Sequence, residues 1–141
     1  MKRKSLYMGT TKIGPQQTVG EIISELVKAD AISVNTDYKG GKIIGLRWIM
    51  LVDGNAVLFD MPVRIEPVFK AMGQHDKDQA ERVAWRQLLR WVQAQNAMID
   101  TGMVTPAEVY FAYSVHAPTG KTLFQFAVES KFKLLGPAAQ D

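Results

Sequence analysis

Three consecutive segments with strand-like patterning constrain the fold more than any other feature of the sequence. Residues 32–38 alternate apolar or β-branched side chains with polar ones, which is the period of a half-buried β-strand. Residues 43–52 are apolar on both faces, as in the central strand of a sheet, and residues 56–65 alternate again. Glycine-rich turns separate the segments, KGGK at 39–42 and DGN at 53–55. Because such turns favour tight hairpins, we expect an antiparallel meander of three strands.

The third of these segments has two further features. Pro62 has no N–H to donate to a neighbouring strand, so this segment is expected at an edge of the sheet. Its alternation places five apolar side chains on one face of the sheet, where they predict contacts with a covering layer of helices. These side chains are Val57, Phe59, Met61, Val63 and Ile65.

Two segments flanking the meander predict helices. TVGE at 18–21 has the spacing of a capping box, in which Thr18 and Glu21 satisfy backbone N–H groups, so a helix is expected at about 19–30. Residues 77–100 carry the longest helical pattern, which Gly102 ends. Its apolar stripe is wide enough to cover a sheet face. The stripe consists of Ala84, Leu88, Trp91, Val92, Ala94, Met98 and Ile99.

The C-terminal third predicts one more helix and one ambiguous segment. Thr105, Pro106 and Glu108 have the cap, first-turn proline and N3 acid of a helix, expected at about 106–115. Residues 121–135 fit either a strand followed by a turn or a last helix. The alternation of their aromatic and aliphatic residues favours the strand.

The expected architecture is therefore α+β: a three- to four-stranded antiparallel sheet, a meander, packed against one long and two short helices. With 141 residues, the chain has the size of one domain. We expect a basic tail and loop over residues 1–17 and a single α+β domain over residues 18–141.

Charge is unevenly distributed along the chain. The sequence pI is about 9.2 and the formal net charge is +3. Residues 1–50 hold eight Lys and Arg against four Asp and Glu, whereas residues 51–141 hold nine against ten. Lys2, Arg3 and Lys4 alone match the whole excess, so the body is close to neutral. A basic tail of this kind adds salt-sensitive phosphate contacts but does not by itself define a nucleic-acid site.

Composition also bounds the cellular setting. The sequence has no cysteine, which excludes disulfides and thiolate chemistry and fits a reducing compartment. No apolar segment of signal-peptide length follows the basic start, and the apolar run at 43–52 is broken by Arg47 and too short to span a bilayer. We expect a cytoplasmic protein.

No constellation of catalytic residues stands out. Asp53 lies in an expected turn and Asp60 on a solvated strand face, which explains both without chemistry. The HDKD run at 75–78 holds one histidine and two acids, and acids before a helix are favoured by its dipole without a metal. Phosphate-loop spacing and a nucleophile motif are missing. We expect a protein that is not an enzyme and has neither metal nor cofactor.

Cationic side chains remain as candidate binding residues, with nucleic acid as the expected ligand. Three arginines recur at four-residue intervals on the helix at 77–100, opposite its apolar stripe. They form either a binding row or a merely solvated face. Trp85 and Trp91 beside them are expected in the core, although an exposed Trp85 would offer base stacking. The full candidate set is Lys39, Lys42, Arg47, Arg64, Arg82, Arg86 and Arg90.

Several segments resemble those of small proteins of unknown function from phages, prophages and bacterial genomes. They are KIGPQQTVGEI at 12–22, AERVAWRQLLRWVQAQ at 80–95, GMVTPAEVYFAY at 102–113 and FKLL at 132–135. The resemblance implies a link to mobile elements and assigns no activity. The order of the expected elements, a helix, a meander and then a long helix, is similar to that in the core of Rad52-type single-strand annealing proteins. In those proteins a basic groove beside the sheet holds DNA.

These observations predict a nucleic-acid-binding protein, such as a single-strand binding or annealing accessory of a phage or mobile element. The alternative is a protein–protein interaction module: an adaptor, an assembly subunit or an inhibitor of a host factor, with homo-oligomerisation possible. In that case the arginine row meets an acidic protein surface, and flexible methionines supply apolar contacts. These methionines are Met50, Met61, Met98 and Met103.

Overall fold

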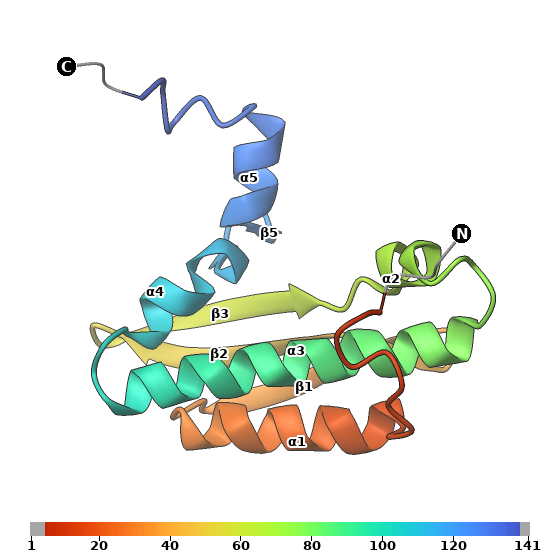
Figure 1. Ribbon diagram of the computed structural model, residues 1–141. Coiled ribbons are helices and arrows are strands. Elements are labelled where there is room, and N and C mark those ends of the chain that lie inside the picture. Colours follow the sequence, from red (N-terminus) through yellow and green to blue (C-terminus); the bar gives the residue numbers. More distant parts are fainter. Residues whose placement is uncertain (1–4, 139–141) are drawn as a thin grey trace.

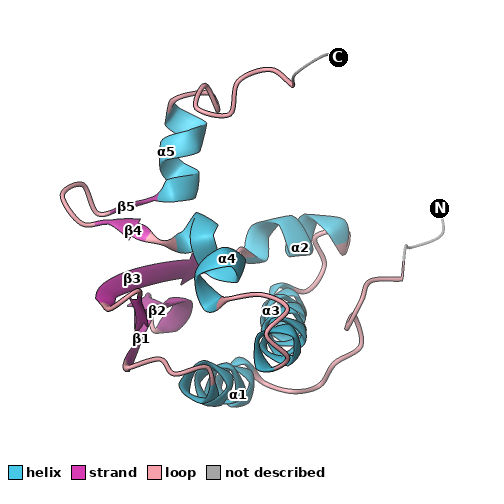
Figure 2. Ribbon diagram, turned by 90° about the vertical axis from the view of Figure 1, so that its left-hand side faces the viewer, coloured by secondary structure: helices cyan, strands magenta, loops and turns pink. Residues whose placement is uncertain are grey.

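The computed structural model describes residues 5–138 and confirms the α+β class (Figure 1). Its main sheet is the expected antiparallel meander, in the order β1 (Ser33–Lys39), β2 (Lys42–Val52), β3 (Asn55–Pro62). Two helices, α1 (Pro15–Lys28) and α3 (Lys77–Asp100), cover one face of this sheet (Figure 2). Within the described residues, no helix is both long and apolar enough to cross a membrane.

The core lies between the sheet and these two helices. Trp48 of β2 stacks on Phe59 of β3, with ring centroids 5.6 Å apart, and Tyr110 meets Trp48 edge-on at 5.2 Å. Gly45 allows the close approach of β2 and β3, because a Cβ there would lie 2.9 Å from the Met61 carbonyl oxygen. The apolar side chains predicted to share one face of the third segment do face the core, as Phe59 and Met61 show, but only as far as Pro62, where β3 ends.

Helix α1 begins earlier than expected. It starts at Pro15, with Gly14 as the N-cap residue, so the capping box predicted at Thr18 is wrong. Proline suits the first helical position because its missing N–H has no partner to lose there. Thr18 instead lies inside the helix, where its hydroxyl donates to the Gly14 carbonyl at 3.4 Å and its side chain is buried.

A helix that the sequence analysis missed follows the meander. Strand β3 ends at Pro62 rather than at residue 65, and α2 (Ile65–Ala71) begins three residues later. The apolar alternation continues across this boundary because Val63, in the loop after β3, still packs against the core. Ile65 already belongs to α2, the helix that packs on α3. Pro67 falls in the first turn of α2, where it costs no hydrogen bond.

The long helix α3 has the predicted bounds, but the predicted stripe is only partly right. Asp76 caps it by accepting a hydrogen bond from the Gln79 N–H at 3.0 Å. Ala94 is exposed, whereas Trp85 and Leu89 are fully buried. Helix α3 is covered by α1, by α2 and by the sheet from different sides. Its buried residues are therefore spread around the helix and do not follow one stripe.

The C-terminal third contains two short helices and a hairpin. The predicted capping box at Thr105 and Glu108 is confirmed and starts α4 (Pro106–Tyr110), which continues as the 3₁₀ turn η1 (Phe111–Tyr113). Strands β4 (Val115–His116) and β5 (Lys121–Thr122) form a small hairpin. The strand favoured for 121–135 is wrong beyond Thr122, because a second capping box, Thr122 with Gln125, starts α5 (Leu123–Glu129).

Candidate interaction surfaces

The arginine row of α3 is not a continuous surface. Arg86 is 5% exposed and lies between α3 and α1. Its Nη1 donates to the Thr18 hydroxyl at 3.2 Å and to the Glu21 carboxylate at 2.9 Å. The hydrogen bond and charge of Arg86 lower the pKa of Glu21, although partial burial opposes them. The expectation of a solvated row is therefore wrong at its middle member, which instead joins two helices.

The two outer arginines of the row are partly exposed. Arg82 donates from Nε to the Gln79 side-chain oxygen at 2.8 Å, and Arg90 donates from Nη1 to that of Gln93 at 2.7 Å. Both acceptors are neutral and lie on the same helix. Trp85, between these arginines in sequence, is fully buried, so the predicted alternative of base stacking on an exposed Trp85 is wrong.

Arg47, the charge that interrupts the central strand, is paired across the sheet. Its Nε donates to Asp37 of β1 at 3.0 Å and lies 3.9 Å from an oxygen of Asp60 on β3. Burial raises the pKa of Asp60, with Arg47 acting in the opposite direction. The three side chains form an ion cluster that spans all three strands on the face away from α1 and α3.

The remaining candidates differ in how they are paired. Lys42 is internally neutralised, since it lies 3.5 Å from Asp78 and 3.7 Å from Glu81. Lys39 and Arg64 form no ion pair with the described residues, and the Arg64 guanidinium lies 6.0 Å from the Phe124 ring centroid. The basic tail, Lys2, Arg3 and Lys4, lies outside the described residues.

The acidic candidates have structural explanations. Asp53 is in the β2–β3 turn with a φ of 50°, and Asp76 caps α3. Among residues 5–138, no three His, Asp or Glu side chains are grouped closely enough to hold a metal ion.

A surface that the sequence analysis missed lies at the C-terminal end. We call residues 123–135, α5 with the turns after it, the arm. It projects from the body beyond the β4–β5 hairpin (Figure 1). Leu134 and Leu135 are 95% and 76% exposed, which is unusual for adjacent large aliphatic side chains. The exposed apolar residues of the arm are Phe124, Val128, Phe132, Leu134 and Leu135.

Two side-chain contacts connect the arm to the β4–β5 hairpin at its base. Lys121 donates from Nζ to both oxygens of Glu129 at 2.9 Å, and the ring of His116 meets Phe126 edge-on at 5.1 Å. The turns after α5 are also ordered by backbone bonds, such as that from the Phe132 N–H to the Ala127 carbonyl at 2.7 Å. The arm therefore stands as a structured extension rather than lying against the body.

An apolar groove opens on the body beside the base of the arm. It has a volume of about 320 Å³ and lies between α2, α3 and η1. Two further apolar side chains in this part of the chain are exposed: Phe111 of η1 at 62%, and Met103, which precedes α4, at 69%. Of the four methionines considered above, Met50 and Met61 are buried. Its lining is mostly apolar but includes two polar side chains, Arg64 and Gln87; the others are Pro62, Val63, Val68, Ala84, Leu88, Trp91 and Tyr113.

The sequence contains signals for the arm and for the groove, but these signals are ambiguous. FKLL at 132–135 exposes its apolar residues only because α5 leads them away from the core. The groove depends on α2, whose boundary the apolar alternation concealed. A scan against models of protein families and searches of curated proteins and solved structures found no match to the chain. Function must therefore be argued from these surfaces.

Proposed function

We propose that the chain is a non-enzymatic protein–protein interaction module, an adaptor or assembly subunit that engages its partner through the arm. The single observation behind this proposal is the row of uncovered apolar side chains on a structured projection. On soluble proteins, apolar patches of several hundred Å² often mark an interaction site. The cysteine-free sequence supports a cytoplasmic setting for the module.

The size of the exposed surface supports binding of a folded partner. With about 150–200 Å² for each fully exposed large side chain, the five apolar residues of the arm present roughly 500 Å². Burying that area is worth about 12 kcal/mol before the cost of association. Association itself costs roughly 4–15 kcal/mol, so the partner's own buried surface sets the affinity.

Internal pairing of the cations further favours this function over nucleic-acid binding. Arg86, Arg47 and Lys42 each face at least one carboxylate of the same chain. A phosphate would have to compete with those carboxylates, whereas nothing in the described residues competes for the end of the arm.

Capture from a nuclease-treated lysate of the organism that encodes the chain tests the proposal. The immobilised wild-type chain is compared with Leu134→Asp/Leu135→Asp, which makes the arm polar without touching the core. We expect at least a tenfold loss of the retained proteins, identified by mass spectrometry. Arg82→Ala/Arg90→Ala is the matched control and should retain them within about twofold. Equal retention by the arm variant would reject the proposal.

Single-stranded nucleic-acid binding is a second candidate, because aromatic and cationic side chains also meet on the arm. The rings of Phe124 and Phe132 are 6.3 Å apart, and Arg64 lies over Phe124. Lys131 and Lys133 flank Phe132 in sequence. Exposed rings beside cations are the elements of a stacking platform for bases.

A salt titration with single- and double-stranded DNA tests this second candidate. If it is correct, affinity falls steeply with salt, and Lys131→Ala/Lys133→Ala lowers the slope of log K against log salt by about one to two units. Phe132→Ala should weaken binding by about 1–3 kcal/mol at every salt concentration. No binding at low salt, or binding that ignores salt, would exclude it.

A further inference from the structure

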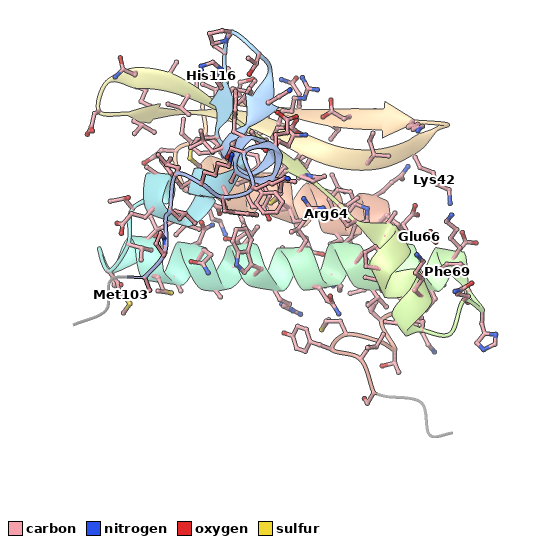
Figure 3. All side chains as sticks on the ribbon, turned by 90° about the horizontal axis from the view of Figure 1, so that it is seen from above. Lys42, Arg64, Glu66, Phe69, Met103 and His116 are labelled. Carbon is pink, nitrogen blue, oxygen red and sulfur yellow. The ribbon has the colours of Figure 1, made fainter. Side chains whose placement is uncertain are left out.

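We propose that residues 5–13 form a strap that closes over α3, opens without unfolding of the body, and, when closed, withholds the Nε–H of Arg82 from acidic ligands. The strap is the segment that precedes α1. It lies along the side of α3 that faces away from the sheet, toward the end of the helix near Phe69 (Figure 3). The strap is separate from the arm, so the inference does not rest on the proposed function.

Two glutamines of α3 hold the strap by its backbone. The side chain of Gln79 donates from Nε2 to the carbonyl oxygens of Gly9 at 3.1 Å and Thr11 at 2.8 Å. Gln87, about two turns further along α3, donates from Nε2 to the carbonyl oxygen of Tyr7 at 2.8 Å. These contacts occur in opposite order along the two segments, so the strap lies antiparallel to α3 over about 12 Å of helix.

No apolar anchor fixes the strap to the core. None of residues 5–13 is buried, and none belongs to the core cluster or packs against it. The side chain of Tyr7 is 63% exposed. A hydrogen bond between neutral groups contributes little net stability, because water replaces the lost partner when the bond opens. The strap therefore opens far more often than the body unfolds.

The closed strap has a defined backbone structure. The Gly9 N–H donates to the Leu6 carbonyl at 2.9 Å, and the Thr11 N–H donates to the Met8 carbonyl at 3.1 Å. Met8 has a φ of 62°, so closure places a residue other than glycine in the left-handed region. A Cβ at Gly9 would lie 2.8 Å from the Leu6 carbonyl oxygen. Closure therefore requires glycine at this position, whereas an open strap does not.

One amide group couples the strap to Arg82. While Nε2 of Gln79 donates to the strap, its Oε1 accepts the Nε–H of Arg82 at 2.8 Å. A carboxylate or phosphate binds arginine most strongly through two parallel hydrogen bonds. A ligand that uses the Nε–H of Arg82 in this way has to take it from Gln79, and thereby loosens the amide that holds the strap. Closure of the strap and binding of such a ligand weaken each other by the same factor.

Amide hydrogen exchange, followed by NMR on the full-length chain, tests whether the strap opens by itself. The hydrogen-bonded amides of Gly9 and Thr11 report the closed strap. We expect them to exchange at least about tenfold more slowly than in an unstructured chain, and at least about a hundredfold faster than amides in the middle of α3. Exchange at the unstructured rate, or exchange as slow as in α3, overturns the inference.

Gln79→Met tests the attachment, because it removes the amide and keeps the length of the side chain. It should speed exchange at Gly9 and Thr11 at least about fivefold and leave core amides unchanged. The matched control is Gln93→Met: Gln93 also lies on α3 and accepts a hydrogen bond from Arg90 at 2.7 Å, but makes no hydrogen bond to the strap. Equal effects of the two variants overturn the inference.

Gly9→Ala tests the coupling to Arg82, because it opposes closure from the strap without altering α3. The NMR resonance of the Arg82 Nε–H should shift toward that of a solvated arginine. The Nε–H resonance of Arg90, whose hydrogen bond to Gln93 comes from Nη1, should stay in place. An unchanged Arg82 resonance, or an equal shift of both arginines, overturns the inference.

Discussion

Replacing Arg86 by alanine separates a structural arginine from a binding one. The guanidinium is buried between α3 and α1 and makes two hydrogen bonds, to Thr18 at 3.2 Å and to Glu21 at 2.9 Å. A net hydrogen bond to a charged group is worth about 1.5–3 kcal/mol. The Glu21 side chain is 35% exposed, so its share must be discounted for solvent screening. With the lost packing of the arginine stem, we expect about 2–3 kcal/mol of destabilisation.

Urea unfolding followed by tryptophan fluorescence measures this effect. A loss of 2–3 kcal/mol lowers the midpoint by about 1 M or more for a chain of this size. Arg82→Ala and Arg90→Ala each remove one hydrogen bond to a neutral glutamine on the same helix, so each should cost at most about 0.5 kcal/mol. If Arg86→Ala unfolds at the same urea concentration as these controls, Arg86 does not join the two helices.

The pH dependence provides a second test of the same pair. The pKa of Glu21 is lowered in the folded protein, chiefly by the hydrogen bond from Arg86. Its contribution to stability is therefore complete above the unfolded pKa of about 4.5 and is lost as pH falls through the lower folded value. The wild type should lose this contribution on acidification, whereas Arg86→Ala should lack it. Parallel pH profiles for the two proteins would contradict the assignment.

Three further substitutions test the core and the sheet. Gly45→Ala places a Cβ about 2.9 Å from the Met61 carbonyl oxygen, so it should lower the unfolding free energy by about 1–3 kcal/mol in urea; no change would refute the close approach. Tyr110→Phe removes a buried hydroxyl that has no hydrogen-bond partner in the described residues. Thermal melting should therefore show equal or higher stability for the variant. A large loss of stability would mean that the hydroxyl makes a hydrogen bond in solution. Burial raises the pKa of Asp60 above 3.8, so folding disfavours its charged form. Asp60→Asn should therefore be equally or more stable than the wild type at pH 7. In the same thermal melts this difference should vanish below pH 3.8.

The meander and the long helix could be predicted because local signals decide them. Alternating apolar side chains and the glycine turns at 40–41 and 54 fix β1, β2 and β3 without reference to the rest of the chain. The bounds of α3 follow from the cap at Asp76 and the stop at Gly102. Each of these signals depends only on residues close together in the chain, so it can be recognised from the sequence alone.

The candidate site could not be predicted in the same way, because it depends on which elements meet. Arg86 has the spacing of a surface residue and is buried only because α1 packs on that side of α3. Leu134 and Leu135 have the composition of a core and are exposed only because α5 leads them away from it. In both cases tertiary packing decides whether the side chain is buried or exposed. The residue pattern within a single segment does not contain that information.

Hydrogen exchange along the chain, with and without the partner that the immobilised protein retains, tests the central claim most directly. If the arm is the interaction surface, amides of residues 123–135 become more protected when the partner binds. Unchanged exchange in the arm, with protection confined to α3 around Arg82 and Arg90, would contradict the account and restore the arginines as the binding surface.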